Sequence, residues 1–154
     1  ILDIIIFGSV IKGKIMPKDI DIAIISNINL KLNIDGFHIS LLKPVDFFIN
    51  HPTLVNTLIR EGYSLRYNKF LSEIYGFSNK ILFKYELVGL KPSIKVKIVN
   101  VLRGKNNEKG IVEKDKGIWL ANQVFLMPIE NADLIEKFFI NFRIKFNKFY
   151  VLIH

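Results

Sequence analysis

Two short apolar segments near the start of the chain, residues 4–7 and 20–25, predict two strands of a buried sheet. A Gly-Ser pair follows the first segment and predicts a turn. Asp19 directly precedes the second segment and Asp21 is its second residue, so in a strand over residues 19–25 their side chains point to the same face. Two carboxylates on an apolar strand repel each other and lose hydration, and a divalent cation is the simplest group to offset both effects. The alternative is a turn in which Asp19 caps the backbone and Asp21 faces water.

Length and composition favour a compact chain without a membrane segment. The chain has 154 residues, of which 50% are hydrophobic, which is enough to bury a core. Its apolar runs are far shorter than the roughly 20 residues that a membrane-spanning helix needs. It has no cysteine, which excludes disulfides, Cys-ligated zinc and thiol catalysis and is compatible with the cytoplasm, the compartment we expect. The chain begins without Met and directly in a predicted strand, which leaves room for an N-terminal segment ahead of it.

Positive charge is concentrated in the second part of the chain. Residues 1–60 carry six Lys or Arg against five Asp or Glu, whereas residues 61–154 carry sixteen against nine. Such a surplus attracts polyanions such as nucleotides or RNA. The alternative is compositional, because a chain rich in Lys, Ile and Asn is typical of an AT-rich genome and scattered lysines often only keep a protein in solution. No dense run of five or six basic residues decides between the two.

The first part of the chain alternates strands with irregular segments and ends in a helix. Pro and Gly residues and a loop rich in Asn mark its breaks. The elements we expect are a strand at 2–7, a short helical or irregular piece at 10–14, a strand at 19–25, a loop at 26–33, a further segment at 37–42, a third strand at 45–49 and a helix from Thr53 that Gly62 closes. This order predicts a mixed α/β core over residues 1–68.

The second part predicts a smaller α+β lobe over residues 69–154. Its apolar residues recur partly at helical spacing and partly in alternation, and residues 81–87 fit either structure. The elements we expect are helices at 69–75, 92–102 and 131–140, a polar loop at 105–109, short strands at 110–113, 117–120 and 123–129, and closing strands at 143–147 and 149–153. The role of this lobe is left open, with acceptor binding as one expectation.

Three motifs in this order resemble the pattern of the polymerase-β-type nucleotidyltransferase superfamily. That pattern is a Gly-Ser turn, a hydrophobic Asp-x-Asp strand and a third carboxylate on a later strand. Here Gly8-Ser9 is followed by Asp19-x-Asp21 and then by Asp46. Each motif alone is weak, whereas the three together on apolar segments are fairly specific.

The chain looks most like the minimal nucleotidyltransferases of archaea and bacteria. Lys12-Gly13 matches the basic residue and glycine that often follow the Gly-Ser pair in that group, whereas Lys18 stands where serine is common before the first aspartate. The resemblance is strong over residues 4–49 and is plausible as far as Gly62. Beyond that point the chain has no recognisable motif of the family.

The resemblance implies a magnesium-dependent transfer of a nucleoside monophosphate, commonly AMP from ATP. Asp19 and Asp21 would hold the metal ion that carries the triphosphate. Asp46 would help to bind a second ion and would activate the acceptor hydroxyl as a general base or through that ion. From the residues alone, Asp46 can instead cap or end its strand, although a carboxylate without a partner inside residues 45–49 is costly.

The resemblance also implies a phosphate-binding turn. Gly8 would let the backbone approach the triphosphate because it has no side chain. Ser9 would donate hydrogen bonds to a phosphate oxygen, and Lys12 would place a positive charge beside it. The alternatives are an ordinary turn at the end of a strand, with Ser9 as a helix cap, and a solvated Lys12.

Four further side chains have both a structural and a functional interpretation. His51 before Pro52 most simply caps the following helix, and a catalytic role is the alternative. Trp119, Phe125 and Tyr150 could stack on a nucleobase, but aromatic residues in apolar strands usually belong to the core.

Three functions from different classes fit this sequence. The first is an active nucleotidyltransferase, which the set of three aspartates favours. The second is a nucleotide- or RNA-binding module without turnover, whose basic second lobe makes the contacts. The third is a nucleotidyltransferase-like antitoxin that acts on a partner protein. The acceptor, the preferred nucleotide and the oligomeric state are not determined by any motif.

Overall fold

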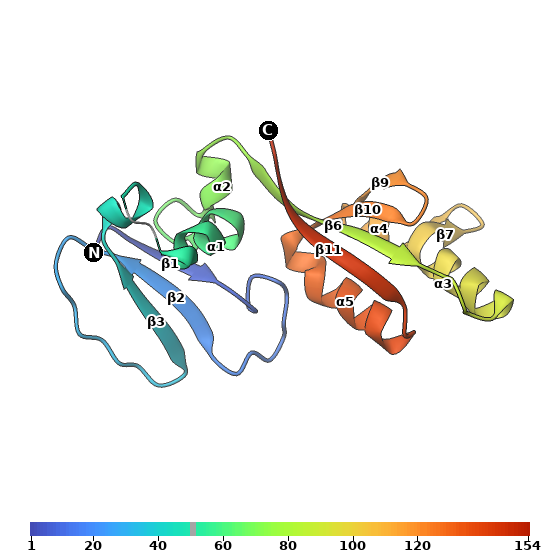
Figure 1. The fold of residues 1–154 in the computed structure, drawn as a ribbon, viewed down its shortest axis with the longest axis horizontal. Helices are drawn as coiled ribbons and strands as arrows, with labels where there is room; N and C mark the ends of the chain where they lie inside the picture. Colours follow the sequence, from blue (N-terminus) through green and yellow to red (C-terminus); the bar gives the residue numbers. More distant parts are fainter. Residues whose placement is uncertain (50–51) are drawn as a thin grey trace. The chain divides into compact units, whose positions relative to one another are not determined.

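The protein is divided into two compact units of mixed α and β structure. The computed structural model describes residues 1–49 and 52–154 (Figure 1). The first unit comprises Ile1–Asn79 with Leu152–His154, and the second comprises Lys80–Val151. The expected α+β class is confirmed, and the division falls at 79/80 instead of 68/69. In the described parts of the chain, no helix is both long enough and apolar enough to span a membrane.

A five-stranded sheet forms the centre of the first unit. Its strands are β1 (Asp3–Phe7), β2 (Ile20–Ile25), β3 (Phe37–Leu42), β4 (Tyr63–Ser64) and β5 (Lys69–Phe70), in the order β3-β2-β1-β4-β5. β1 and β2 run antiparallel, and β3 runs parallel to β2. Parallel neighbours need a connection that returns along the sheet, and residues 26–36 provide it. The first unit extends beyond residue 68, where its end was expected, because β4 and β5 belong to this sheet.

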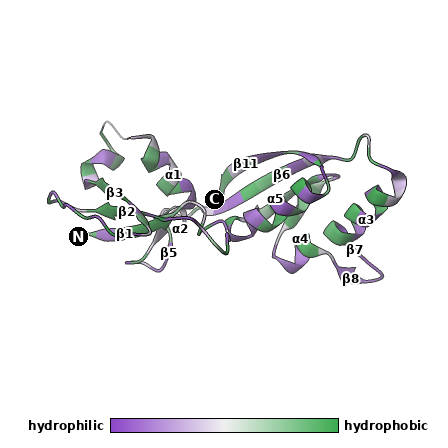
Figure 2. Cartoon of the chain, turned by 90° about the horizontal axis from the view of Figure 1, so that it is seen from below, coloured by the Kyte–Doolittle hydropathy of each residue, from purple (hydrophilic) through white to green (hydrophobic). Residues whose placement is uncertain are grey.

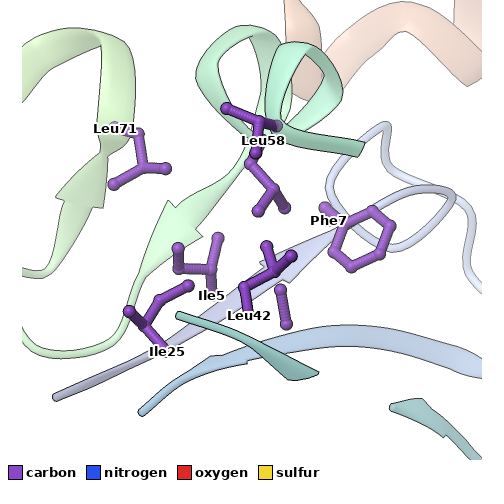
Figure 3. Close-up of a cluster of buried hydrophobic side chains, with 8 residues drawn as sticks. Ile5, Phe7, Ile25, Leu42, Leu58 and Leu71 are labelled. Carbon is purple, nitrogen blue, oxygen red and sulfur yellow. The ribbon is translucent and has the colours of Figure 1, made fainter. Parts of the chain in front are cut away.

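One amphipathic helix, α1 (Thr53–Glu61), covers the sheet of the first unit. Alternate residues of a strand face opposite ways, so Ile5 and Ile25 lie on the face that α1 covers. Leu58 of α1 points toward them in Figure 3. The buried cluster consists of Ile5, Phe7, Ala23, Ile25, Leu42, Val55, Leu58 and Leu71. This cluster is the hydrophobic core of the unit.

The helix α1 ends at Gly62, as the sequence predicts, and the reason is packing. The φ angle of Gly62 is −78°, which any residue can adopt. A Cβ at this position would lie 2.7 Å from Cγ2 of Ile5 and would also press on the backbone of Leu58. Glycine therefore lets the end of α1 approach β1 closely.

Residues 45–49 do not form the expected third strand. A 3₁₀ turn, η1 (Pro44–Phe47), begins there instead. Pro44 lacks the N–H that a central strand would need. The carboxylate of Asp46 accepts a hydrogen bond from the backbone N–H of Lys43 (2.7 Å), which closes the turn locally. The strand that pairs with β2 is the preceding segment, β3.

The second unit is a four-stranded sheet with helices on one face. Its strands are β6 (Ser78–Glu86), β9 (Ile118–Ala121), β10 (Val124–Pro128) and β11 (Lys145–Ile153), in the order β11-β6-β10-β9. Its helical segments are α3 (Pro92–Arg103), α4 (Ile111–Lys114), η2 (Ile129–Asn131) and α5 (Ala132–Asn141), and the hairpin of β7 (Gly104–Lys105) and β8 (Glu108–Lys109) joins α3 to α4. Figure 2 shows β6 and β11 on one side and the helices on the other.

Alternation along β6 decides which side chains meet the helices of the second unit. Phe83 and Tyr85 are buried, whereas Lys84 between them is exposed. The Phe83 ring centroid lies 5.6 Å from that of Phe125 on β10 and 6.0 Å from that of Phe139 on α5. Burial raises the pKa of the Tyr85 hydroxyl, against the opposing effect of a nearby arginine. These aromatic rings form the core between the sheet and the helices.

Three expected elements take other forms. The strand expected at 110–113 is the helical turn α4, and the helix expected at 69–75 is β5 followed by one helical turn, α2 (Leu71–Ile74). The two closing strands are one continuous strand, β11. Lys148, near its middle, forms an ion pair with Glu136 of α5 (2.7 Å). The chain therefore continues along α5 at the point where a turn was predicted.

Leu58→Ala should lower the free energy of unfolding of the first unit by about 2–5 kcal/mol. Leu58 is fully buried, so its truncation leaves a cavity between α1 and the sheet. Urea denaturation followed by circular dichroism measures the change. Ile15→Ala serves as the control because Ile15 is 89% exposed, and it should change the same quantity by less than about 0.5 kcal/mol. Equal effects of the two substitutions would contradict the packing of α1 on this sheet.

Candidate nucleotide and metal site

The turn after β1 lies directly against the first residues of β2. The two strands pair so that Phe7 is opposite Asp21, which brings the residue after Phe7 beside the same carboxylate. That residue, Gly8, has a φ angle of +76°, in the region that favours glycine. A Cβ at Gly8 would also collide with Oδ2 of Asp21. The backbone of the turn and the Asp21 carboxylate therefore share one site.

The loop that follows is a compact turn. The backbone N–H of Gly13 donates to the carbonyl of Val10 (3.1 Å), and the N–H of Lys14 donates to the carbonyl of Ser9 (3.1 Å). These bonds close the loop on itself, in agreement with the irregular piece predicted at 10–14. Ser9 is thereby held at the start of the loop, one residue after Gly8.

The two acidic residues lie at the start of β2. The strand begins at Ile20, so Asp21 is within it and Asp19 is in the bend just before it. Asp19 is exposed, and the side chain of Asp21 is 29% exposed. Asp21 belongs to the strand face that also carries Ala23 and Ile25 of the core cluster. The structure therefore brings Asp21 to the Gly-Ser turn and keeps Asp19 in the adjacent bend.

A histidine on the neighbouring strand contacts Asp21. In the parallel register of β2 and β3, His38 is directly opposite Asp21. Its Nδ1 lies 3.1 Å from Oδ1 of Asp21, and its side chain is 72% exposed. The sequence analysis did not single out His38, because its position depends on which segment pairs with β2. The sequence offered one signal for this contact. His38 is the second residue of β3 and Asp21 is the second residue of β2, so the two lie side by side if the strands pair in parallel from their first residues.

The third expected ligand, Asp46, lies at the other end of the sheet. β2 and β3 run in the same direction and end together at Ile25 and Leu42, and Asp46 follows in η1. At about 3.3 Å per residue, the end of β2 is about 13 Å from Asp21. Asp46 and Ser26 line a pocket of about 430 Å³ there. The expectation that Asp46 is a metal ligand and a catalytic residue is corrected, since its carboxylate caps η1 instead.

Few metal donors gather beside the turn. Among the residues that the structure describes, no group of three or more His, Cys, Asp or Glu side chains is arranged to hold a metal ion. The donors available are the Asp21 carboxylate, the His38 ring and, one residue before the strand, Asp19. Magnesium is often bound through one or two carboxylates together with substrate phosphates and water. These donors fit an ion that arrives with a triphosphate better than an ion ligated by protein alone.

Lys12 forms an ion pair with a buried glutamate. Its Nζ lies 3.0 Å from Oε2 of Glu61, the last residue of α1, whose side chain is only 3% exposed. A carboxylate at such a depth needs a partner, because burial removes its hydration. The pair ties the turn to α1. This contact gives Lys12 a structural role, and its contact with a nucleotide stays a prediction.

Of the three aromatic side chains considered for base stacking, one lies in the core and two are half-buried. Phe125 is fully buried, so it cannot receive a nucleobase. Trp119 packs on Phe125, with ring centroids 5.0 Å apart, and the guanidinium carbon of Arg103 lies 4.0 Å from its ring centroid. Tyr150 is half-buried. His51, the other side chain singled out, lies outside the described residues.

Comparisons of the chain with protein-family models, with curated proteins and with solved structures found no match.

Lys12→Met should lower the free energy of unfolding by about 2 kcal/mol, because it leaves the Glu61 carboxylate buried without this cation. Adding Glu61→Gln should restore most of the loss, since the buried charge is then removed as well. Chemical denaturation of the wild type and of both variants gives these differences. Lys14→Met, at an exposed position of the same loop, is the matched control. A double variant less stable than Lys12→Met would speak against the ion pair.

Proposed function

We propose that this protein is a nucleotidyltransferase that binds a nucleoside triphosphate with a divalent cation, magnesium being the expected ion. It would transfer the nucleoside monophosphate, with AMP from ATP as the first candidate, to an acceptor. The observation that carries this proposal is the contact between the Gly-Ser turn and the Asp21 carboxylate at the start of β2. This is the arrangement expected from the resemblance to the polymerase-β-type superfamily.

The turn supplies the phosphate side of the proposed site. Gly8 has no side chain to keep a phosphate away from the backbone, and its φ angle of +76° shapes the turn. Ser9 can donate a hydrogen bond from its hydroxyl and another from its N–H to a phosphate oxygen. Both donors are neutral, so they orient the phosphate without balancing its charge.

The two aspartates supply the metal side of the site. A triphosphate and the carboxylates of Asp19 and Asp21 repel each other, and a divalent cation between them removes that repulsion. When bound, the cation neutralises the charge that develops on the departing pyrophosphate. The β2 backbone holds Asp21 in place, whereas Asp19 stands in the preceding bend, where it can turn toward the ion.

A second candidate function is nucleotide binding without transfer. The position of Asp46 favours it, because the third carboxylate expected to activate the acceptor caps η1 at the far end of the sheet. A protein of this kind would bind the triphosphate and the cation through the same turn and the same two aspartates. It would release no pyrophosphate.

Incubation with labelled ATP, a divalent cation and cell extract tests the first candidate. The wild type should transfer label and release pyrophosphate, and Asp19→Asn with Asp21→Asn should reduce both by about 100-fold or more. Asp46→Asn is the matched control: it removes the same charge, but its amide oxygen can still accept from Lys43, so activity should stay within about threefold. Binding of ATP without pyrophosphate release would select the second candidate. No binding of any of the four nucleoside triphosphates would overturn both.

We infer that the acceptor is polyanionic, most simply a single-stranded nucleic acid. The second unit carries fourteen Lys or Arg against seven Asp or Glu, whereas the first is nearly balanced. Lys84 of β6 and Lys145 of β11, both exposed, line one pocket of about 180 Å³ together with one acidic residue, Glu86. Lys84 alternates with Phe83 and Tyr85, which are buried against α5, so it lies on the opposite face of the sheet. This surface can neutralise phosphates, which is the term that dominates affinity for nucleic acids.

Lys84→Glu with Lys145→Glu should weaken binding of a fluorescent single-stranded RNA at least tenfold, and it should reduce the dependence of binding on salt. Fluorescence anisotropy at several salt concentrations measures both quantities. Lys31→Glu with Lys69→Glu changes the net charge equally in the first unit and should have a smaller effect. If the two double variants bind alike, the positive surface acts only through net charge. Unchanged binding in both would refute a polyanionic acceptor.

A further inference from the structure

The contact between Asp21 and His38 is the feature of the site that the proposed function leaves unexplained. The ring Nδ1 and the carboxylate Oδ1 are 3.1 Å apart. A surface hydrogen bond or ion pair of this kind contributes little to stability, about 0–1 kcal/mol. The side chain of His38 is 72% exposed, so its ring is accessible to a ligand of the site.

Their separation suits two neighbouring ligands of one metal ion. In an octahedral ion with bonds of about 2.0–2.1 Å, donors at right angles to each other lie about 2.8–3.0 Å apart. Nδ1 of His38 and Oδ1 of Asp21 lie 3.1 Å apart, a separation compatible with this arrangement as well as with the hydrogen bond between them. A cation bound by both atoms would replace this hydrogen bond, and the imidazole ring would turn to aim its nitrogen lone pair at the ion.

The strands that carry the two donors hold them at the same level of the sheet. β2 and β3 pair in parallel over six residues, and Asp21 faces His38 at the second position of each. Gly8 packs against the other carboxylate oxygen, Oδ2, so Oδ1 is the oxygen turned toward the ring. Asp21 and His38 therefore lie next to the Gly-Ser turn, which is the proposed binding site for the phosphates of a nucleotide.

We propose that Asp21 and His38 are adjacent ligands of one divalent cation and that this donor set selects Mn²⁺ over Mg²⁺. The proposal rests on the nucleotide site proposed above and names the ion that this site prefers. Magnesium favours oxygen ligands and gives up water reluctantly, whereas imidazole nitrogen suits the transition metals, among which Mn²⁺ also accepts carboxylate and phosphate oxygens. A nitrogen donor in place of a third carboxylate shifts the preference accordingly.

The test is a titration with Mn²⁺ in the presence of a non-hydrolysable ATP analogue, with free Mn²⁺ followed by electron paramagnetic resonance. Calorimetry under the same conditions gives the affinity for Mg²⁺. The wild type should bind Mn²⁺ at least tenfold more tightly than Mg²⁺. His38→Ala should weaken Mn²⁺ binding at least tenfold and Mg²⁺ binding less than threefold. His38→Asp should restore an all-oxygen donor set and reverse the preference.

Two controls separate the possible failures. His154→Ala removes a second exposed histidine of the same unit and should leave both affinities unchanged. Circular dichroism of each variant verifies that it is folded. If the wild type binds neither ion nor the analogue, the nucleotide site itself is wrong. If it binds both ions alike and His38→Ala has no effect, the site stands and only the assignment of His38 is overturned.

Discussion

The antiparallel pairing of β1 with β2 is the interaction on which the candidate site depends. Its register places Phe7 opposite Asp21, so the chain that leaves β1 must pass beside a carboxylate. Only a residue without a Cβ fits there, and Gly8 occupies the position. A slip of one residue in this pairing would turn Asp21 to the other face and separate it from the turn. The chemistry proposed for the site is thus a consequence of strand register.

Burial of apolar side chains holds that register in place. The core cluster joins the covered face of the sheet to α1, and the ion pair of Lys12 with Glu61 attaches the loop to the end of that helix. The Asp21 carboxylate, near the start of β2, then has neighbours on two sides. The turn at Gly8 lies against one of its oxygens, and the edge strand β3 places His38 opposite it.

Local patterns were sufficient for some elements and insufficient for others. β1, β2, α1 and α3 follow from apolar spacing and from the Pro or Gly residues at their ends, which act over a few residues. The segment at 45–49 has the apolar pattern of a strand, yet Pro44 and the capping carboxylate of Asp46 lower the free energy of a 3₁₀ turn below that of a strand. The pair Asn147-Lys148 predicts a turn between two closing strands, yet the chain continues there as one strand against α5. In these places competition between local and long-range pairing decided the outcome.

The sequence by itself determined the Gly-Ser turn, the acidic start of β2 and the basic character of the second unit, because residue identity and short spacing carry that information. Only the tertiary structure decided which side chain faces Asp21. Parallel pairing joins segments that are far apart in the chain, and its register depends on the whole core. That pairing placed His38 beside Asp21 and sent Asp46 to the opposite end. The imidazole of His38 therefore stands beside Asp21, where sequence reasoning expected a third carboxylate.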